Sequence, residues 1–201
     1  MTETLRADLA RVANQIPAGS RVLDLGCGRG ERLRYLTTRQ GCSGLGVEHD
    51  PASLLEAITA GVPVLDLDVD TGLGQFADAS FDIVLSLKLQ ATRHPVEVLR
   101  QMARIGARLI VSMPNFAYWP HRLTLLRGDM PRSSDLPFDW FDTPNLHFAT
   151  LDSLESLFSS LGLTQVSRVA LKPNGQPVKW LPNVRAGSAI YVLTKTSEAR
   201  P

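Results

Sequence analysis

The first short apolar segment of the chain is followed by three glycines in a G-x-G-x-G pattern at residues 26–30, and Asp24 lies two residues before the first of them. Glycine adopts positive φ angles and lets a ligand approach the backbone without a Cβ in the way. Dinucleotide sites use the different spacing G-x-G-x-x-G, and Asp24 would repel a pyrophosphate but attract an ammonium group. S-adenosylmethionine (SAM) carries that ammonium and no pyrophosphate, so the turn predicts a SAM site. Besides Asp24, we expect four residues of the turn to contact the cofactor: Gly26, Cys27, Gly28 and Gly30.

A second acid, Glu48, ends the apolar segment GLGVE at residues 44–48. Ligands of open α/β sheets lie beyond the carboxyl ends of the strands, near the switch point. A carboxylate there can accept hydrogen bonds from both ribose hydroxyls. Glu48 follows Gly30 by 18 residues, close to the spacing of about 20 for a ribose-binding acid. We expect His49 at the rim of the site and Asp50, which precedes a proline, at the N-cap of a helix.

Further polar side chains follow the third and fourth apolar segments. Three acids alternate in LDLDVDTGL, and Asp68 is the expected acceptor of the adenine amino group, with the Val69 backbone beside the ring. The alternating acids could instead indicate a metal, but an oxygen-rich Ca²⁺ loop needs more ligands and a bidentate acid downstream. We therefore expect no metal. At the end of the fourth segment, Ser86 and Gln90 are expected to line the floor near the sulfonium.

Strands and helices that alternate along the chain must position these groups. Apolar runs of strand length alternate with segments of helical periodicity, which predicts βαβ units and a parallel sheet with right-handed crossovers. The expected strands of this part are 21–25, 44–48, 62–67, 81–87 and 107–113. The expected helices are 3–15, a helix after the glycines with Leu33 and Leu36 on one face, 51–60 and 95–104. The helix at 3–15 rests on four apolar residues at helical spacing: Leu5, Leu9, Val12 and Ile16.

The last part of the chain adds a helix at 151–161 and two strands at 164–171 and 188–194, joined by a loop rich in proline and glycine. A hairpin at the end of a parallel sheet indicates an antiparallel last strand. We therefore predict an α/β protein with the Rossmann-like class I methyltransferase fold. Its sheet is seven-stranded and mostly parallel, with helices on both faces. No linker or repeat interrupts the sequence, so residues 1–201 are expected to form one domain that begins with a helical segment over residues 1–17.

Composition narrows the possible partners and the compartment. The formal net charge is +1, whereas proteins that bind nucleic acid usually show a basic face, so nucleic acid is disfavoured as a partner. Cys27 and Cys42 are too few for a disulfide framework, which indicates a reduced, cytoplasmic protein. The N-terminus lacks the apolar run of a signal peptide, and no stretch approaches the roughly 20 apolar residues that cross a membrane. We expect small soluble ligands and no membrane partner.

Aromatic residues gather in the irregular segment 113–150, which holds seven of the thirteen in the chain. A long irregular segment within a compact domain is usually functional. It leaves the same sheet edge as the predicted site, so it is interpreted as a lid or as a docking surface with aromatic and arginine anchors. Alternatively, most of its rings form a small additional core. His121 and His147 are the candidate general bases here, although a structural role is the simpler interpretation of each.

Several longer stretches resemble the MetW family of bacterial methionine-biosynthesis proteins, over roughly residues 18–171. The glycine-rich turn is common to class I methyltransferases. The motifs specific to the MetW family are PNFAYW, RLTLLRG, PFDW and DTPN with a following histidine. The resemblance implies a SAM-methyltransferase fold and a role beside the homoserine O-acyltransferase that starts methionine synthesis. This chain departs from the family at Arg29, where an acid is usual. It also has Leu87 and Lys88 in place of a Gln-Thr pair, and Lys88 would bring positive charge close to the sulfonium.

Two functions follow from this sequence. In the first, the protein binds SAM or S-adenosylhomocysteine and supports the homoserine O-acyltransferase as a partner or activator. In the second, it is a SAM-dependent methyltransferase that acts on a small molecule, because methyl transfer needs mainly proximity and in-line orientation. The residues alone favour the second function, and the family resemblance favours the first.

Overall fold

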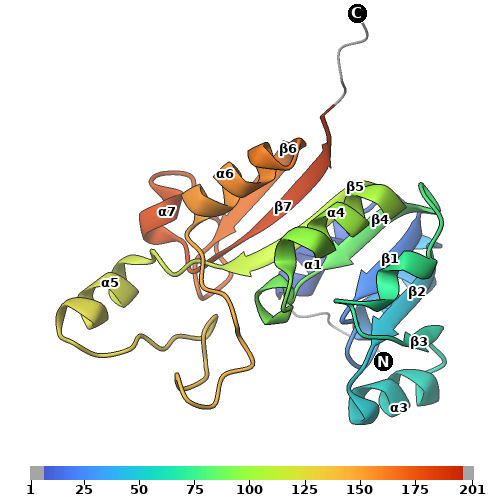
Figure 1. Ribbon diagram of the computed structural model, residues 1–201, viewed down its shortest axis with the longest axis horizontal. Coiled ribbons are helices and arrows are strands. Elements are labelled where there is room, and N and C mark those ends of the chain that lie inside the picture. The colour runs from blue at the N-terminus through green and yellow to red at the C-terminus, as the bar shows by residue number, and fades with distance from the viewer. Residues whose placement is uncertain (1–6, 197–201) are drawn as a thin grey trace, which may run out of the picture. The chain divides into compact units, whose positions relative to one another are not determined.

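The computed structural model describes residues 7–196 of the chain (Figure 1). Its strands are β1 (Arg21–Leu25), β2 (Ser43–Glu48), β3 (Val64–Asp66), β4 (Phe81–Ser86), β5 (Gly106–Pro114), β6 (Leu163–Leu171) and β7 (Ser188–Lys195). Its α-helices are α1 (Ala7–Ala13), α2 (Glu31–Gln40), α3 (Pro51–Thr59), α4 (Pro95–Ile105), α5 (Trp119–Leu126), α6 (Leu151–Ser160) and α7 (Pro182–Arg185). Two short 3-10 turns, Gly72–Gln75 and Leu89–Ala91, precede and follow β4.

The strands form one seven-stranded sheet in the order β3-β2-β1-β4-β5-β7-β6. β1 pairs in parallel with β2 and with β4, β2 pairs in parallel with β3, and the last two strands, β6 and β7, pair antiparallel. This mixed sheet with alternating helices confirms the predicted α/β fold. From β1 to β5, strands and helices alternate along the chain as predicted. The apolar residues of β1, β4 and β5 are largely buried, and α2 and α4 each bury an apolar face. β3 is half-buried or exposed, and α3 buries only Ala57.

Parallel pairing brings the ends of four strands to one edge. Leu25, the last residue of β1, lies opposite Val47 of β2 and Ser86 of β4. Glu48, the last residue of β2, lies opposite Asp66 of β3. The turns that follow these strands therefore start from the same edge of the sheet.

The chain divides into two compact units, each with its own buried residues. The first holds the residues up to Leu87 together with His94–Ile110, and its core lies around β1, β4 and α4. The second holds Lys88–Arg93 and the residues from Val111 onward. Its core includes the Phe158 and Tyr191 rings, which meet edge to face with centroids 5.2 Å apart. The prediction of one domain over residues 1–201 stays a prediction.

Several elements are shorter than the sequence indicates. The described part of the first helix is Ala7–Ala13, and Leu5 of the predicted helix 3–15 lies outside the described residues. β3 begins at Val64 rather than at Val62 because the Val62 N–H donates to the Ala57 carbonyl at the end of α3. Val12 and Ile16 are buried, as their helical spacing predicts.

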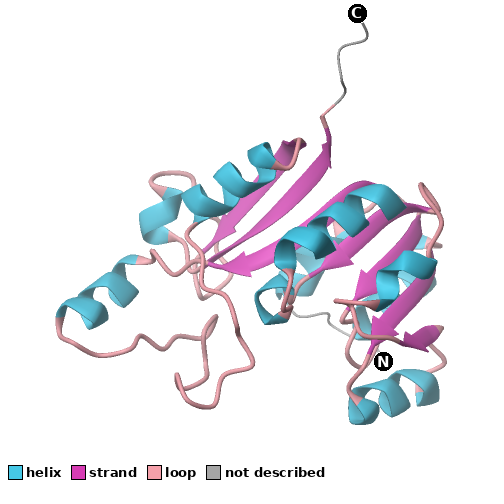
Figure 2. Cartoon of the chain, in the orientation of Figure 1, coloured by secondary structure: helices cyan, strands magenta, loops and turns pink. Residues whose placement is uncertain are grey.

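The prediction that residues 113–150 lack regular structure is wrong in part, because β5 extends to Pro114 and Trp119–Leu126 form α5. Pro120, in the first turn, suits a helix start. Periodicity did not indicate this helix because its leucines face solvent and His121 is its buried residue. Between α5 and α6 the chain runs as a loop (Figure 2). Within residues 7–196 no helix has the length and apolar character needed to span a membrane.

Candidate functional site

The glycine-rich turn joins β1 to α2 through backbone that only glycine adopts easily. Gly26, Gly28 and Gly30 have φ angles of 69°, 59° and 76°. A Cβ placed on Gly30 would lie 2.8 Å from a Val62 methyl carbon, whereas a Cβ placed on Gly28 would meet no atom within 4 Å. Gly30 is thus required by packing as well as by its φ angle. Gly28 leaves its backbone open to an approaching ligand.

Glu48 is buried at the end of β2, and its carboxylate is held by backbone N–H groups on both sides. Its Oε2 accepts a 2.8 Å hydrogen bond from Gly28, and its Oε1 accepts 3.0 Å bonds from His49 and Asp50. Several backbone donors fix the orientation of the carboxylate. The ribose-binding candidate and the open glycine are therefore joined by a hydrogen bond.

Asp24 lies in β1 with no exposed surface, and its carboxylate is bound by Arg32 in the first turn of α2. The Arg32 Nε donates to Oδ2 at 3.0 Å, and Nη2 donates to both oxygens at 2.5 and 2.7 Å. Arg32 is nearly as buried as its partner. Arg32 was not among the residues expected at the site, although it lies just after the glycine turn and eight residues beyond Asp24. Contact of Asp24 with an ammonium group stays a prediction.

Cys27 packs inward from the turn. A Cβ on Gly46 of β2 would lie 2.5 Å from the Cys27 Sγ, so the bare backbone of Gly46 makes room for the thiol. Burial, and after it the charges of Asp24 and Glu48, raises the pKa of the Cys27 thiol to about 12. A neutral thiol of this kind is a packing group rather than a nucleophile. Any contact of Cys27 with a cofactor would therefore come from its backbone.

The charged side chains at the rim are paired. Arg29, the position where the family resemblance implies an acid, forms a 3.1 Å ion pair with Glu56 of α3, and both side chains are exposed. The His49 Nδ1 lies 2.9 Å from the Asp66 Oδ1, and this hydrogen bond raises the pKa of His49. His49 is exposed, and its place at the rim of a cofactor site and its contact with a cofactor stay predictions.

Asp68 folds back onto the turn that follows β3. Its Oδ1 accepts a 2.8 Å hydrogen bond from the Asp70 N–H, and its carbonyl accepts one of 2.7 Å from Gly72. Asp70 in turn accepts from the His94 N–H at 2.8 Å. The alternating acids thus shape the loop beside Val69, which is half-buried. Among residues 7–196, no group of three or more His, Cys, Asp or Glu side chains is arranged to hold a metal ion.

Ser86 is buried opposite Leu25 at the end of β4. Four residues later, the Gln90 carbonyl accepts hydrogen bonds from the Leu146 and His147 N–H groups at 2.9 and 3.1 Å. The buried Oε1 of Gln90 and Nε2 of His147 have no hydrogen-bond partner among the described residues. The sequence did not indicate this link, because the two segments are more than fifty residues apart.

The segment 113–150 is partly a core and partly an exposed surface. His121 is buried against the Phe116 and Tyr118 rings, with centroids 6.1 and 5.4 Å away. Neither His121 nitrogen has a hydrogen-bond partner in the described part of the chain, and burial lowers its pKa. This arrangement agrees with a structural role rather than with a general base. By contrast, the rings from Phe138 to Phe141 face solvent.

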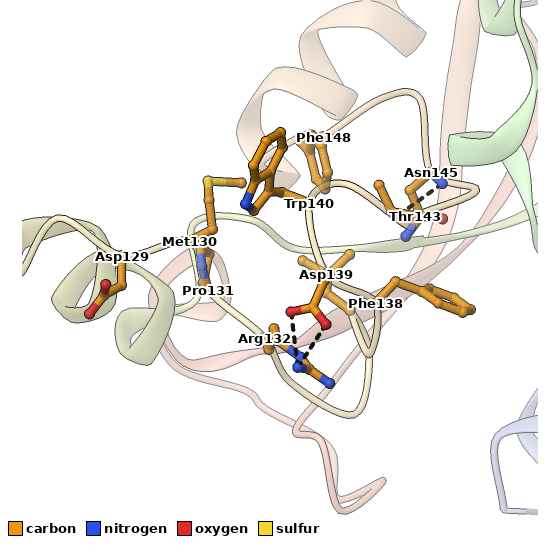
Figure 3. A pocket seen from close by; sticks show the side chains of 11 residues that line it. Asp129, Met130, Pro131, Arg132, Phe138, Asp139, Trp140, Thr143, Asn145 and Phe148 are labelled. Atoms are coloured by element: carbon orange, nitrogen blue, oxygen red, sulfur yellow. Dashed lines mark hydrogen bonds and ion pairs between the residues drawn. The ribbon is translucent and has the colours of Figure 1, made fainter.

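Beyond α5, the loop surrounds a hollow of about 180 Å³ (Figure 3). That volume is below the roughly 300–1,000 Å³ of most small-molecule pockets. In Figure 3 the Met130, Trp140 and Phe148 side chains lie together on one side, and Arg132 and Asp139 form an ion pair on the other. The hollow is lined by Asp129, Met130, Pro131, Arg132, Leu136, Phe138, Asp139, Trp140, Thr143, Asn145 and Phe148.

Solved structures with this fold include SAM-dependent methyltransferases. One from Archaeoglobus fulgidus is 16% identical, with a TM-score of 0.69 and coverage of 94% of this chain and 92% of that one. One from Mesorhizobium loti is also 16% identical, with a TM-score of 0.69 and coverage of 94% and 98%. The [4+2]-cyclase SpnF is 13% identical, with a TM-score of 0.66 and coverage of 94% and 80%. A fold that also serves a cyclase does not by itself specify methyl transfer.

Sequence comparison gives a more specific relationship. The bifunctional methionine biosynthesis protein MetXA/MetW of Rhodopirellula baltica is 38% identical over 173 residues, which are 80% of this chain and 27% of that protein. The chain therefore spans about a quarter of the curated relative it matches. A family model described as methionine biosynthesis protein MetW matches residues 6–193. The chain belongs to the MetW family.

Proposed function

We propose that this protein binds SAM or S-adenosylhomocysteine at the turn after β1 and acts in methionine biosynthesis as a partner of homoserine O-acyltransferase. One observation carries the ligand assignment: the open backbone of Gly28 is bonded to the buried carboxylate of Glu48. An open glycine cradle beside a fixed anionic acceptor fits an adenosine whose ribose offers two hydroxyl donors. SAM, when bound, would supply an electrophilic methyl group on its sulfonium.

The residues of the first unit have distinct roles in this proposal. Glu48 would accept the ribose hydroxyls and Gly28 would leave room for the nucleoside. Asp68 and Val69 would border the adenine, and Ser86 would close the floor. Asp24 is the exception, since Arg32 already neutralises its charge within the fold. We infer that Asp24 does not contact the ammonium group of SAM directly. Its ion pair with Arg32 would instead hold the glycine-rich turn in the position that binds this end of the ligand.

The partner assignment is supported by the fused relative. In Rhodopirellula baltica one polypeptide carries both MetXA and MetW. Linking two modules raises their effective concentration to about the millimolar range, which serves proteins that act together. We therefore assign the present chain to association with a separate homoserine O-acyltransferase, whose activity it would support.

A titration tests both parts of this proposal. Calorimetry with SAM and with S-adenosylhomocysteine, each with and without the acyltransferase, should show saturable binding of at least one nucleoside. Copurification at micromolar concentrations should give a complex, and the acyltransferase rate should rise in it. If neither nucleoside binds at millimolar concentration, the ligand assignment is wrong. If the two proteins elute separately at micromolar concentration, the partner assignment is wrong.

A second candidate function, methyl transfer to a small molecule, rests on the same open turn and on the methyltransferase fold. Incubation with radiolabelled SAM and a cell extract should then give a labelled small-molecule product. A protein that binds SAM but labels nothing would exclude this candidate and leave the partner function in place.

A further inference from the structure

Large apolar side chains are concentrated on the loop between α5 and α6. Six of them, which we call the aromatic surface, are 45–72% exposed: Met130, Phe138, Trp140, Phe141, Leu146 and Phe148. Of this set, the Met130, Trp140 and Phe148 side chains lie together in Figure 3. Contiguous exposed apolar patches on soluble proteins mark interaction sites, and Trp in particular is enriched among the residues that dominate binding energy.

The loop that carries the aromatic surface is held in shape from within. Arg132 closes a short ring by donating to both Asp139 oxygens, at 2.9 and 3.1 Å, and to the Pro137 carbonyl at 3.2 Å. Ser133 and Leu136 exchange backbone hydrogen bonds of 3.0 and 3.1 Å, and the Leu136 side chain is buried. These contacts restrain the loop in the unbound chain, and such restraint reduces the entropy lost on binding.

The most exposed rings lie just beyond this closed ring. Trp140 and Phe141 are 69% and 72% exposed and meet edge to face with centroids 5.7 Å apart. They follow Asp139, whose carboxylate is part of the Arg132 contact. Two adjacent rings on a restrained loop are a suitable pair of anchors for a complementary pocket. The hollow beside them is small, so the loop presents side chains to a partner rather than enclosing a ligand of cofactor size.

We propose that the aromatic surface is the face that docks onto the homoserine O-acyltransferase, with Trp140 and Phe141 as its central anchors. This inference rests on the proposed function, since it locates on this chain the association that the MetXA/MetW polypeptide supports. A relative that carries MetXA and MetW on one chain places a MetXA surface within reach of its MetW part at all times. In the present protein, a separate acyltransferase would bury the exposed rings on binding.

Matched variants test the docking surface. The double variant Trp140→Ala/Phe141→Ala should weaken binding to the purified acyltransferase roughly tenfold or more, as expected for the loss of central anchors. Trp180, before α7, is 67% exposed, so Trp180→Ala removes the same side chain at nearly the same exposure and should leave the affinity unchanged. Leu55→Ala on α3, also 65% exposed in the native chain, is a second control. Affinity is measured by biolayer interferometry on the full chain.

The readouts separate this inference from the proposed function. If the native chain does not bind the acyltransferase, both the partner and its surface are wrong. If the native chain binds but the double variant binds equally well, the partner stands and the aromatic surface is wrong. Hydrogen exchange gives a check that needs no variant: adding the acyltransferase should protect amides of residues 128–148. Ultracentrifugation that shows self-association of the native chain, abolished in the double variant, would reassign the surface to a second copy.

Discussion

The Gly28 N–H donates a 2.8 Å hydrogen bond to the Glu48 carboxylate, and this contact joins the turn after β1 to the end of β2. Because a Cβ on Gly28 would meet no atom within 4 Å, the same residue that holds the acid also leaves the space beside it open. Gly28 and Glu48 therefore form the centre of the candidate site, and the hydrogen bond between them holds both in position.

Replacing Glu48 by alanine should remove the charged acceptor from the site. A hydrogen bond to a charged group contributes about 1.5–3 kcal/mol, so the Kd for SAM or S-adenosylhomocysteine is expected to rise roughly 10- to 150-fold. Calorimetry measures the change, and Glu56→Ala, which removes an exposed carboxylate on α3, is the control. Unchanged affinity in a folded Glu48→Ala protein would show that the ribose contact is assigned to the wrong residue.

The two glycines of the turn should respond differently to alanine. Gly28→Ala carries the strain of a positive φ angle, about 1–2 kcal/mol. It should also reduce ligand affinity, because its Cβ would occupy the space that the proposed ligand fills. Gly30→Ala adds to that strain a 2.8 Å approach to Val62, so its free energy of unfolding should fall further. Urea titration measures the free energy of unfolding of both variants, and calorimetry measures the ligand affinity of Gly28→Ala. Equal stability losses in the two variants would contradict the packing role given to Gly30.

Arg32→Ala should be strongly destabilising, because it leaves the Asp24 carboxylate buried without its counter-charge. Breaking a buried ion pair from one side costs about 3–5 kcal/mol. Arg29→Ala removes an exposed pair, which is worth about 0–1 kcal/mol, and serves as the control. The double variant Asp24→Asn/Arg32→Met removes both charges and should recover part of the loss in chemical denaturation. A double variant less stable than Arg32→Ala would argue against this account.

The buried His121 predicts a loss of stability in mild acid. Burial lowers its pKa more than the nearby carbonyls of Asn115 and Phe116 raise it. Below its ordinary value of about 6.5, the unfolded state therefore binds a proton that the folded state resists. Its contribution to stability is present above that pH and falls as the pH drops toward the folded pKa, by at most about 1.4 kcal/mol per pH unit.

His121→Phe should flatten that pH dependence. The free energy of unfolding, measured at pH 7.5 and at pH 5.5 for both proteins, gives the comparison. The native chain should lose more stability between the two pH values than the variant. His94→Phe, at an exposed histidine, is the matched control. Identical pH profiles for the native chain and His121→Phe would show that protonation of His121 does not oppose folding.

Local patterns predicted the frame of the site because they depend on residues close in sequence. The runs that form β1, β2 and β4 are buried strands, as their apolar composition indicates. Glycine spacing located the turn, and Asp50 caps α3 by accepting from the Ser53 N–H at 2.8 Å, as the following proline indicated. The sequence did not reveal α5, because its apolar residues do not share a buried face.

The sequence by itself determined which strands end in acids and glycines. Because parallel strands end at the same edge of a sheet, these groups must meet there. Only the tertiary structure decided what each group contacts. Asp24 is committed to Arg32, whereas Glu48 is held toward Gly28. Burial and partner choice come from packing between segments distant in sequence, and no local pattern encodes them.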